Sequence, residues 1–325
     1  MFVSRRALLG ALSCAIFAPT IARAMSRLRI GILKFGTVNW ELESLKHNGF
    51  DRLHNIEVEP AYFAGEDATN IAMLAGEIDM IVSDWLWVSR LRSERENLAL
   101  IPYSTAVGAI MVRQDSPILS ISDLKDRKIG VAGGPLDKSW LLIQALAQRD
   151  FNLDLAAANE VVYGAPPLLS EKARQGEFDA VLNFWHFCAR LEASGFRRLV
   201  SANDAAIALG ARGPVSSLGY VVRDEWAREN ETLLRNFMAA SAQTKSLLAT
   251  SNEEWVRLAP VVKAEGEELH ALRDRYREGI PMRPVADDAA DAAHLYEVLA
   301  QIGGEKLVGK APHMAPGTYW SGLFE

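Results

Sequence analysis

Short apolar runs alternate with amphipathic stretches along the first part of the chain. Residues 27–35 (RLRIGILKF) read as a strand with a buried middle, and residues 56–63 (IEVEPAYF) alternate as a half-buried strand does. Residues 38–50 and 67–77 repeat apolar positions at helical spacing, and residues 78–85 (IDMIVSDW) read as another buried strand. This β-α-β-α-β order predicts a parallel sheet with crossover helices.

The same alternation returns between residues 97 and 227, after which the pattern becomes almost wholly helical. Two similar stretches, VGAIMVR from residue 107 and LGYVVR from residue 218, stand where strands could cross between two halves. We therefore predict an α/β fold of two lobes joined by two crossover strands, with a helical C-terminal segment. The expected bounds are 25–110 and 221–325 for lobe 1, and 111–220 for lobe 2. Two crossover strands would form a hinge.

The first 24 residues have the pattern of a secretory signal peptide. Arg5 and Arg6 precede an apolar run that is too short to span a membrane, and Ala22-Arg23-Ala24 is a small-x-small cleavage site. The stretch SRRALL also resembles a twin-arginine signal, so both export routes stay open. The apolar run continues beyond Cys14 and a better cleavage site follows, so we expect no lipid anchor. The sequence thus predicts a periplasmic protein.

Charge and cysteine content narrow the range of possible partners and of covalent cross-links. The chain has a formal charge of −6; without the three arginines of the signal, 32 basic residues face 41 acidic ones, which gives −9. This balance argues against nucleic acid and anionic membrane as partners. No later stretch approaches 18 uninterrupted apolar residues, so we expect the mature protein to be soluble. Its single cysteine, Cys188, allows no internal disulfide and is expected to be a buried apolar residue.

Residues that follow the predicted strands are the candidate ligand contacts, because open α/β sheets bind ligands outside the carboxyl ends of their strands. They combine aromatic side chains with a few polar groups, as binding clefts do, although core packing is the alternative for each aromatic residue. Lys34 and Lys138 are the only basic residues at these positions, so we expect no strong preference for an anion. The predicted ligand-binding residues are Lys34, Phe35, Gly36, Trp40, Ser83, Asp84, Trp85, Ser104, Gly134, Asp137, Ser139, Trp140, Asn183, Trp185 and His186.

Asp84 is the most specific of these candidates. A carboxylate at the end of a buried strand is costly unless it is paired or solvated. It could anchor a cationic group or a metal on the ligand side. It could instead pair with Arg90 or Lys34, or cap the helix that follows.

The turn in residues 128–143 (KIGVAGGPLDKSWLLI) also allows a structural and a ligand-binding interpretation. Gly133 and Gly134 permit a positive φ or a close backbone approach, but the stretch lacks the spacing of a phosphate-binding loop. Asp137 either caps the following helix or contacts a ligand. As a cap it would occupy the free N–H groups and repel an anion. Ser139 and Trp140 are then the better ligand contacts.

Catalytic and metal chemistry have little support in the sequence. His186 is the only histidine at a predicted strand end, and there is no HExxH, G-x-S-x-G, CxxC or phosphate-loop motif. Asp84, Asp137 and Asp179 could supply oxygen ligands, but no local motif gathers them. We therefore predict no catalytic residue, no metal site and no cofactor.

Several stretches together resemble a known family, in the family's order: residues 29–36, AMLAGEIDMIVSD (72–84), MVRQDSPILSISDLKDRKIGVAGG (111–134), ARQGEFDAVLNFW (173–185) and GYVVRDEWARENETLLRNFMAAS (219–241). The chain resembles the periplasmic substrate-binding proteins of ABC transporters. Within them it is similar to the nitrate/sulfonate/taurine-type, NMT1/THI5-like and SsuA-like group, which has the type II periplasmic binding protein fold.

This resemblance implies a soluble component of an ABC importer. Such a protein captures a small molecule in the cleft between its lobes and delivers it to an inner-membrane permease with its ATPase. We expect a monomer. Relatives in systems for alcohol oxidation by quinoproteins imply an alternative, a periplasmic protein that binds or senses a ligand or metal related to a lanthanide or a quinone cofactor. A pyrimidine-synthesis enzyme of the THI5-like type is a further alternative, against which the export signal argues.

Overall fold

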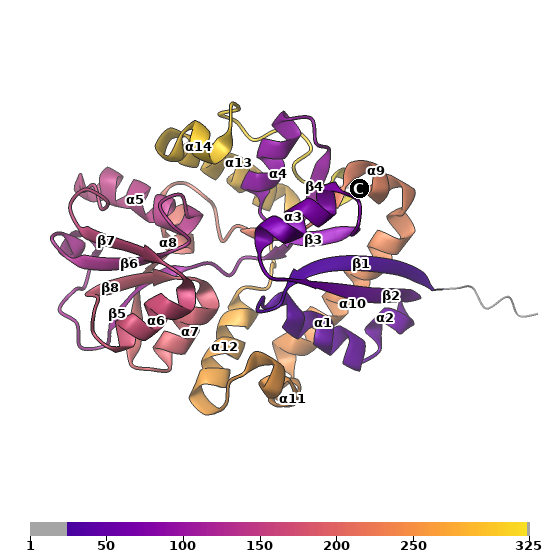
Figure 1. Cartoon of the computed structure of the whole chain (residues 1–325), viewed down its shortest axis with the longest axis horizontal. Helices are drawn as coiled ribbons and strands as arrows, with labels where there is room; N and C mark the ends of the chain where they lie inside the picture. The colour runs from indigo at the N-terminus through magenta and orange to yellow at the C-terminus, as the bar shows by residue number, and fades with distance from the viewer. Residues whose placement is uncertain (1–24, 324–325) are drawn as a thin grey trace, which may run out of the picture.

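The structure, a computed structural model, describes residues 25–323 and consists of two α/β halves side by side (Figure 1). The predicted signal peptide, residues 1–24, lies outside the described residues. None of the helices described is both long and apolar enough to cross a membrane.

The first sheet has the strand order β2-β1-β3-β10-β4. β1 pairs in parallel with β2 and β3, whereas β10 runs antiparallel between β3 and β4. The parallel strands therefore end at one edge, where the Lys34 amide donates to the Phe63 carbonyl at 3.0 Å. Its strands are β1 (Ser26–Leu33), β2 (Ile56–Phe63), β3 (Met80–Ser83), β4 (Leu98–Ser104) and β10 (Leu218–Arg223).

Helices cover both faces of this sheet, and we call the sheet with these helices the first lobe. α1 and α10 bury apolar side chains such as Leu45 and Phe237 against Leu28 and Ile30 of β1. α3 and α4 pack on the strands from the other side. The helices of this lobe are α1 (Val38–His47), α2 (Phe50–Leu53), α3 (Glu66–Leu74), α4 (Trp85–Ser93), α9 (Asp224–Glu229) and α10 (Glu231–Thr250).

The second sheet has the corresponding order β7-β6-β8-β5-β9, and with its helices it forms the second lobe. β6 is parallel to β7 and β8, and β5 runs antiparallel between β8 and β9. Its strands are β5 (Ala109–Arg113), β6 (Lys128–Ala132), β7 (Glu160–Gly164), β8 (Ala180–Asn183) and β9 (Phe196–Ser201). Its helices are α5 (Lys138–Phe151), α6 (Pro166–Arg174), α7 (Trp185–Glu192), α8 (Ala202–Ala208) and the 3₁₀ turn η1 (Ile121–Leu124).

The chain crosses between the sheets through residues 105–108 and returns before Leu218. β5 lies wholly in the second sheet and β10 wholly in the first. The expected lobe boundaries, 110/111 and 220/221, thus fall inside these two strands rather than in the connections before them. The predicted fold class of two α/β lobes is confirmed by this topology, but the chain crosses between the lobes in connecting segments and not in the two crossover strands that we expected.

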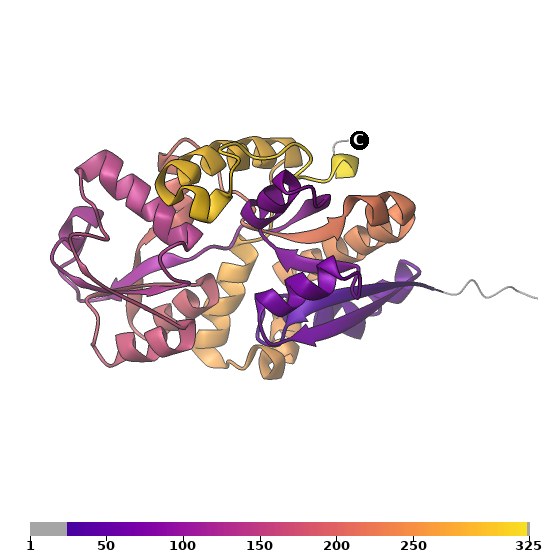
Figure 2. The same cartoon turned by 45° about the horizontal axis from the view of Figure 1, so that its top comes forward.

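The last part of the chain is helical as predicted, and it contacts both lobes. α12 packs against α7, and α13 packs against α5, both of which belong to the second lobe. In Figures 1 and 2, α13 and α14 lie across one side of the junction between the lobes and α11 and α12 across the other. The elements are α11 (Asn252–Val262), α12 (Gly266–Glu278), α13 (Val285–Gly303), α14 (Glu305–Val308) and the 3₁₀ turn η2 (Ser321–Leu323).

The end of the chain then returns to the first sheet. Leu100 of β4 donates its amide to the Thr318 carbonyl at 2.8 Å and accepts from the Trp320 amide at 3.0 Å. The sequence placed the whole segment after residue 220 in the first lobe. Amphipathic spacing identifies the buried face of a helix but not the neighbour that covers it, which is why the contacts of α12 and α13 with the second lobe were missed.

Candidate functional site

A cavity of about 560 Å³ opens between the two lobes. It is bounded by the β1–α1 turn, α1 and β2 of the first lobe, by α7 of the second lobe, and by the end of α11. The predicted ligand contacts that line it are Lys34, Phe35, Gly36, Trp40 and His186. The structure therefore brings together residues that followed two different predicted strands, one from each lobe.

The β1–α1 turn holds the first three of these residues in place. The Gly36 amide donates to the Leu33 carbonyl at 3.0 Å, and the Asn39 side-chain amide donates to the carbonyls of Leu33 and Gly36 at 2.8 Å each. With the turn fixed in this way, Lys34 and Phe35 point away from the core, and Phe35 is 80% exposed. A large apolar side chain held so openly beside a cavity is suited to contact a ligand.

Positive charge dominates the cavity wall. Lys34, Lys46, Arg190 and Lys263 line it together with one carboxylate, Glu43. Lys46 donates to the Val58 carbonyl at 2.9 Å, and Arg190 pairs with Glu268. Lys34 and Lys263 take part in none of the ion pairs described between residues 25 and 323, and the Lys263 ammonium lies 5.9 Å from the centre of the Phe35 ring.

His186 at the start of α7 is neutral at neutral pH. Burial, together with the nearby positive charge of Arg190, lowers the pKa of His186 from 6.5 to about 4. An anion in the cavity would offset both effects, because it favours the protonated imidazole. His186 is therefore a neutral part of the cavity wall, and a bound anion would raise its pKa.

Aromatic rings form the inner wall where the lobes meet. Trp40 of α1 packs edge to face on Trp185 of α7, with ring centroids 5.7 Å apart, and on Trp255 of α11 at 6.0 Å. Tyr276 of α12 completes the group at 6.4 Å from both Trp40 and Trp185. Trp185 itself borders a separate cavity of about 50 Å³ at the crossing segment, which is also lined by Thr105.

A buried carboxylate lies behind this wall, one residue after Trp40. Glu41 has no solvent exposure and accepts hydrogen bonds from the hydroxyls of Tyr220 (2.8 Å), Ser241 (2.5 Å) and Tyr276 (3.2 Å). It also forms an ion pair with Lys245. Burial lowers the pKa of Lys245, although the Glu41 charge opposes this shift. The network ties α1 to β10, α10 and α12.

Asp84 and Asp137 have structural partners rather than free carboxylates. Asp84 is the N-cap of α4, where it accepts from the Trp87 amide at 2.8 Å, and it also pairs with Lys138 at 2.6 Å. Asp137 is the N-cap of α5 and accepts from the Trp140 amide at 3.0 Å. Of the alternatives for Asp84, the cap is therefore observed, and the ion-pair partner is Lys138 instead of Arg90 or Lys34.

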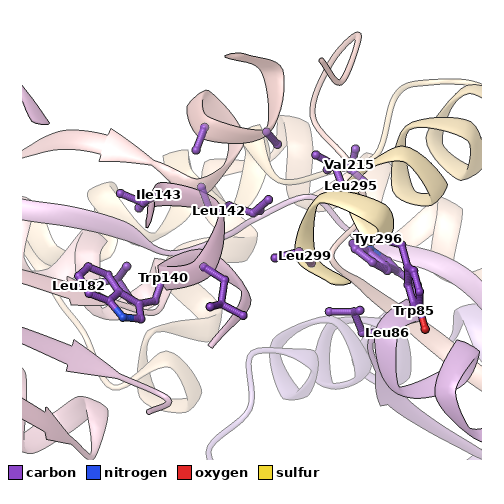
Figure 3. Packing of buried hydrophobic residues seen from close by; sticks show 14 of the residues in the cluster. Trp85, Leu86, Trp140, Leu142, Ile143, Leu182, Val215, Leu295, Tyr296 and Leu299 are labelled. Atoms are coloured by element: carbon purple, nitrogen blue, oxygen red, sulfur yellow. The ribbon is translucent and has the colours of Figure 1, made fainter. Parts of the chain in front are cut away.

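Three of the predicted ligand contacts lie in the protein interior. Trp85 and Trp140 are 3% and 0% exposed and pack in the apolar cluster shown in Figure 3. Asn183 is fully buried, and its amide donates to the Pro166 carbonyl and the Ser170 hydroxyl at 2.9 Å each. These side chains line neither cavity, because the strand-end rule locates a position along the chain but not the direction of its side chain.

The remaining candidates are at the crossing segment or in turns. Ser104 donates to the Gly279 carbonyl at 3.3 Å and accepts from the Ala106 amide at 3.1 Å. Ser83 is half-buried at the end of β3, and Ser139 is half-buried in the first turn of α5. Gly134 has a φ of +87°, so the positive φ expected for this glycine turn is present.

The cavity residues that the sequence analysis missed include one aromatic and three basic side chains: Tyr62, Lys46, Arg190 and Lys263. Tyr62 precedes the end of β2, and Arg190 follows His186 by one helical turn, so a search of the same helix face could have found it. Lys46 lies at the end of α1 and Lys263 follows α11, so the rule that selects residues after strands could not find them. No group of three or more His, Cys, Asp or Glu side chains that could hold a metal ion occurs in the described part of the chain.

Comparison with known families gives one match. A family model described as NMT1/THI5 like matches residues 46–254, which is more than half of the chain. No curated protein sequence matches the chain.

Solved structures of similar fold extend over nearly the whole chain. The periplasmic aliphatic sulphonate binding protein SsuA of Escherichia coli has a TM-score of 0.72 at 18% identity, covering 91% of this chain and 92% of that one. The alkanesulfonate-binding protein SsuA of Xanthomonas axonopodis pv. citri, bound to MOPS, has a TM-score of 0.65 at 16% identity, with 91% and 98% covered. A putative periplasmic sulfonate-binding protein of Methylobacillus flagellatus KT has a TM-score of 0.64 at 17% identity, with 90% of each chain covered. These likenesses concern the fold.

Proposed function

The chain belongs to the NMT1/THI5-like family and has the periplasmic binding protein fold, and from this premise we propose that it is the solute-binding component of an ABC importer. It is exported to the periplasm, captures a small organic anion between its lobes, and delivers it to an inner-membrane permease with its ATPase. It acts by binding and not by catalysis.

The observation that carries this proposal is the shared wall of the cavity. Lys34 and Phe35 of the first lobe and His186 and Arg190 of the second lobe border the same space of about 560 Å³. A ligand that contacts both walls favours the arrangement in which the lobes are together, because it binds that arrangement more tightly. A permease can then recognise the loaded protein by its shape.

The anionic character of the ligand is a change from the sequence-based expectation. Of the two basic candidates, Lys138 is paired with Asp84, but Lys46, Arg190 and Lys263 join Lys34 at the cavity. Lys34 and Lys263 beside an exposed aromatic ring suit a sulfonate or carboxylate on an organic body. The similar folds of sulfonate-binding proteins support the same class of ligand.

Calorimetry with ligand-free protein tests the proposal. The mature chain is unfolded in denaturant, dialysed and refolded to remove any co-purified molecule, and then titrated with organic sulfonates, including MOPS, with carboxylates and with amines of matched size. We expect one of the anions to bind, and at a hundredfold excess over its Kd to raise the Tm by about 4 °C. Lys34→Gln and Lys263→Gln should each weaken its binding by about tenfold.

Lys125→Gln is the control, since this lysine of the second lobe is exposed and is not among the residues that line the cavity. Equal affinity in all three variants would contradict the assignment of the cavity. Turnover of a small molecule by the refolded protein would contradict the binding-protein function itself.

A further inference from the structure

The two lobes are joined by an ion pair at the starts of two helices. The Lys138 ammonium of α5, in the second lobe, donates to the Asp84 carboxylate of α4, in the first lobe, at 2.6 Å. Both side chains are largely covered, with 17% of the Asp84 side chain and 31% of the Lys138 side chain exposed. An ion pair with this degree of cover is less screened by salt than one on the open surface.

Each partner is held in place by its own helix. One Asp84 oxygen caps α4 by accepting from the Trp87 amide, which leaves the other oxygen directed to Lys138. Lys138 is the first residue of α5, directly after the cap Asp137. Little side-chain freedom of Asp84 is therefore lost when the pair forms, so that the ordering cost falls mainly on the Lys138 stem.

The surroundings favour a charged lysine. Burial disfavours the ammonium, but Asp84, Asp137 and Glu66 act in the opposite direction, and together they raise the pKa of Lys138 above its ordinary value. Asp84 and Glu66 belong to the first lobe, whereas Asp137 precedes Lys138 in the second. Separation of the lobes would therefore leave Asp84 without its cation, while Asp137 would keep Lys138 beside it.

Apolar packing continues from the ion pair along the same side of the junction. Trp85 and Leu86 follow Asp84 in α4, and Leu142 lies one turn after Lys138 in α5; all belong to one buried cluster. Figure 3 shows Leu299 of α13 between Leu142 and Leu86 in this cluster. The ion pair therefore stands at the edge of a packed junction and not at the rim of an open cleft.

We propose that the Asp84–Lys138 pair is a latch that stabilises the arrangement in which the two lobes are together. The residues that line the candidate cavity come from the β1–α1 turn, α1, β2, α7 and the end of α11, and include neither member of the pair. The latch thus acts on the lobes and not on the bound solute. It therefore favours the same arrangement of the lobes as a bound solute does, through a contact that the solute does not make.

Single-molecule energy transfer on ligand-free, refolded protein tests the latch. Dyes are attached to Arg52→Cys in the first lobe and to Lys125→Cys in the second. Cys188 stays unlabelled, because it is fully buried and burial raises the pKa of its thiol to about 11. Asp84→Asn keeps an N-cap for α4 but removes the charge, and Lys138→Met keeps the apolar stem of the lysine. Lys128→Met is the control, because it breaks an exposed pair with Glu160 inside the second lobe.

We expect the ratio of closed to open molecules to fall about three- to tenfold in Asp84→Asn and in Lys138→Met. The double variant should open no further than the single ones, since both remove the same interaction. The control should match the parent. Single variants with an unchanged ratio of closed to open molecules, or additive effects in the double variant, would each overturn the latch. Because no ligand is present, these outcomes are independent of the proposed transport function.

Discussion

Trp40 and Trp185 meet edge to face across the two lobes, with their ring centroids 5.7 Å apart. One tryptophan comes from the first helix of the first lobe and the other from the helix after β8 of the second lobe. The contact joins the inner wall of the candidate cavity to the aromatic cluster of α11 and α12. The residues that shape the binding site therefore also hold the lobes together.

Replacement of Trp40 by alanine should destabilise the whole protein. Its side chain is 5% exposed and contacts Trp185, Trp255 and Tyr276, so its loss leaves a large hole in a packed cluster. We expect a loss of about 3–5 kcal/mol in the free energy of unfolding, measured by denaturant titration. Phe35→Ala, at an 80% exposed position of the same cavity, should change it by less than about 0.5 kcal/mol. Similar losses in both variants would show that the cluster has no special role.

Removal of the Glu41 charge should cost stability through its partner. In Glu41→Gln, Lys245 stays buried without its carboxylate, and we expect a loss of about 3–5 kcal/mol in the free energy of unfolding. The double variant Glu41→Gln/Lys245→Met removes the stranded charge and should recover much of that loss. Chemical denaturation of the three proteins gives the coupling energy. A stable single variant would mean that Lys245 finds another partner or loses its proton without cost.

His186 should make stability depend on pH in the acid range. Its pKa is about 4 in the folded protein and near 6.5 in an unfolded chain, so the unfolded state binds more protons between these values. The stabilisation is complete above pH 6.5 and is lost as the pH falls towards 4, with a total of up to about 3 kcal/mol. His186→Gln should flatten the pH dependence of the unfolding free energy over this interval. Identical slopes in the two proteins would contradict the lowered pKa.

Gly108 should not tolerate a side chain in the first crossing segment. A Cβ at this position would lie 2.5 Å from the Asn183 carbonyl oxygen and 3.2 Å from the Ser139 hydroxyl. The backbone of Asn183 cannot move aside easily. We therefore expect Gly108→Ala to lower the free energy of unfolding by about 1–3 kcal/mol, measured by thermal or chemical unfolding. Gly65→Ala is the matched control, since nothing lies within 4 Å of its Cβ position and its φ is extended. Equal stability of both variants would show that the crossing segment adapts.

The fold could be predicted because its signals are local. Alternating apolar strands and amphipathic helices indicated two α/β lobes, and the turn at Gly133 and Gly134 has the positive φ values that such a glycine pair suggests. The short stretches on which the family resemblance rested include residues inside the matched range 46–254. Each of these features depends on neighbouring residues in the chain, which is what a single sequence contains.

The candidate site was only partly predictable because its contacts are distant in the chain. Lys34 and His186 were found from the strand-end rule, but Lys263 comes from the turn after α11, to which that rule does not apply. Asp84 was recognised as a residue in need of a partner, and its partner Lys138 lies 54 positions away in the other lobe. Trp140 shows the converse limit, since a residue in the right place along the chain had its side chain in the core.

The path of the C-terminal helices limits how the molecule can move. The chain leaves the first lobe after α10, passes over α7 and α5 of the second lobe, and is fastened again to β4 through Thr318 and Trp320. The segment from α11 to α14 thus contacts the second lobe on two sides of the junction, and both of its ends are attached to the first lobe. Because these attachments allow sliding more readily than wide separation, the lobes should shift by shear between packed helices and not swing apart about the two connecting segments.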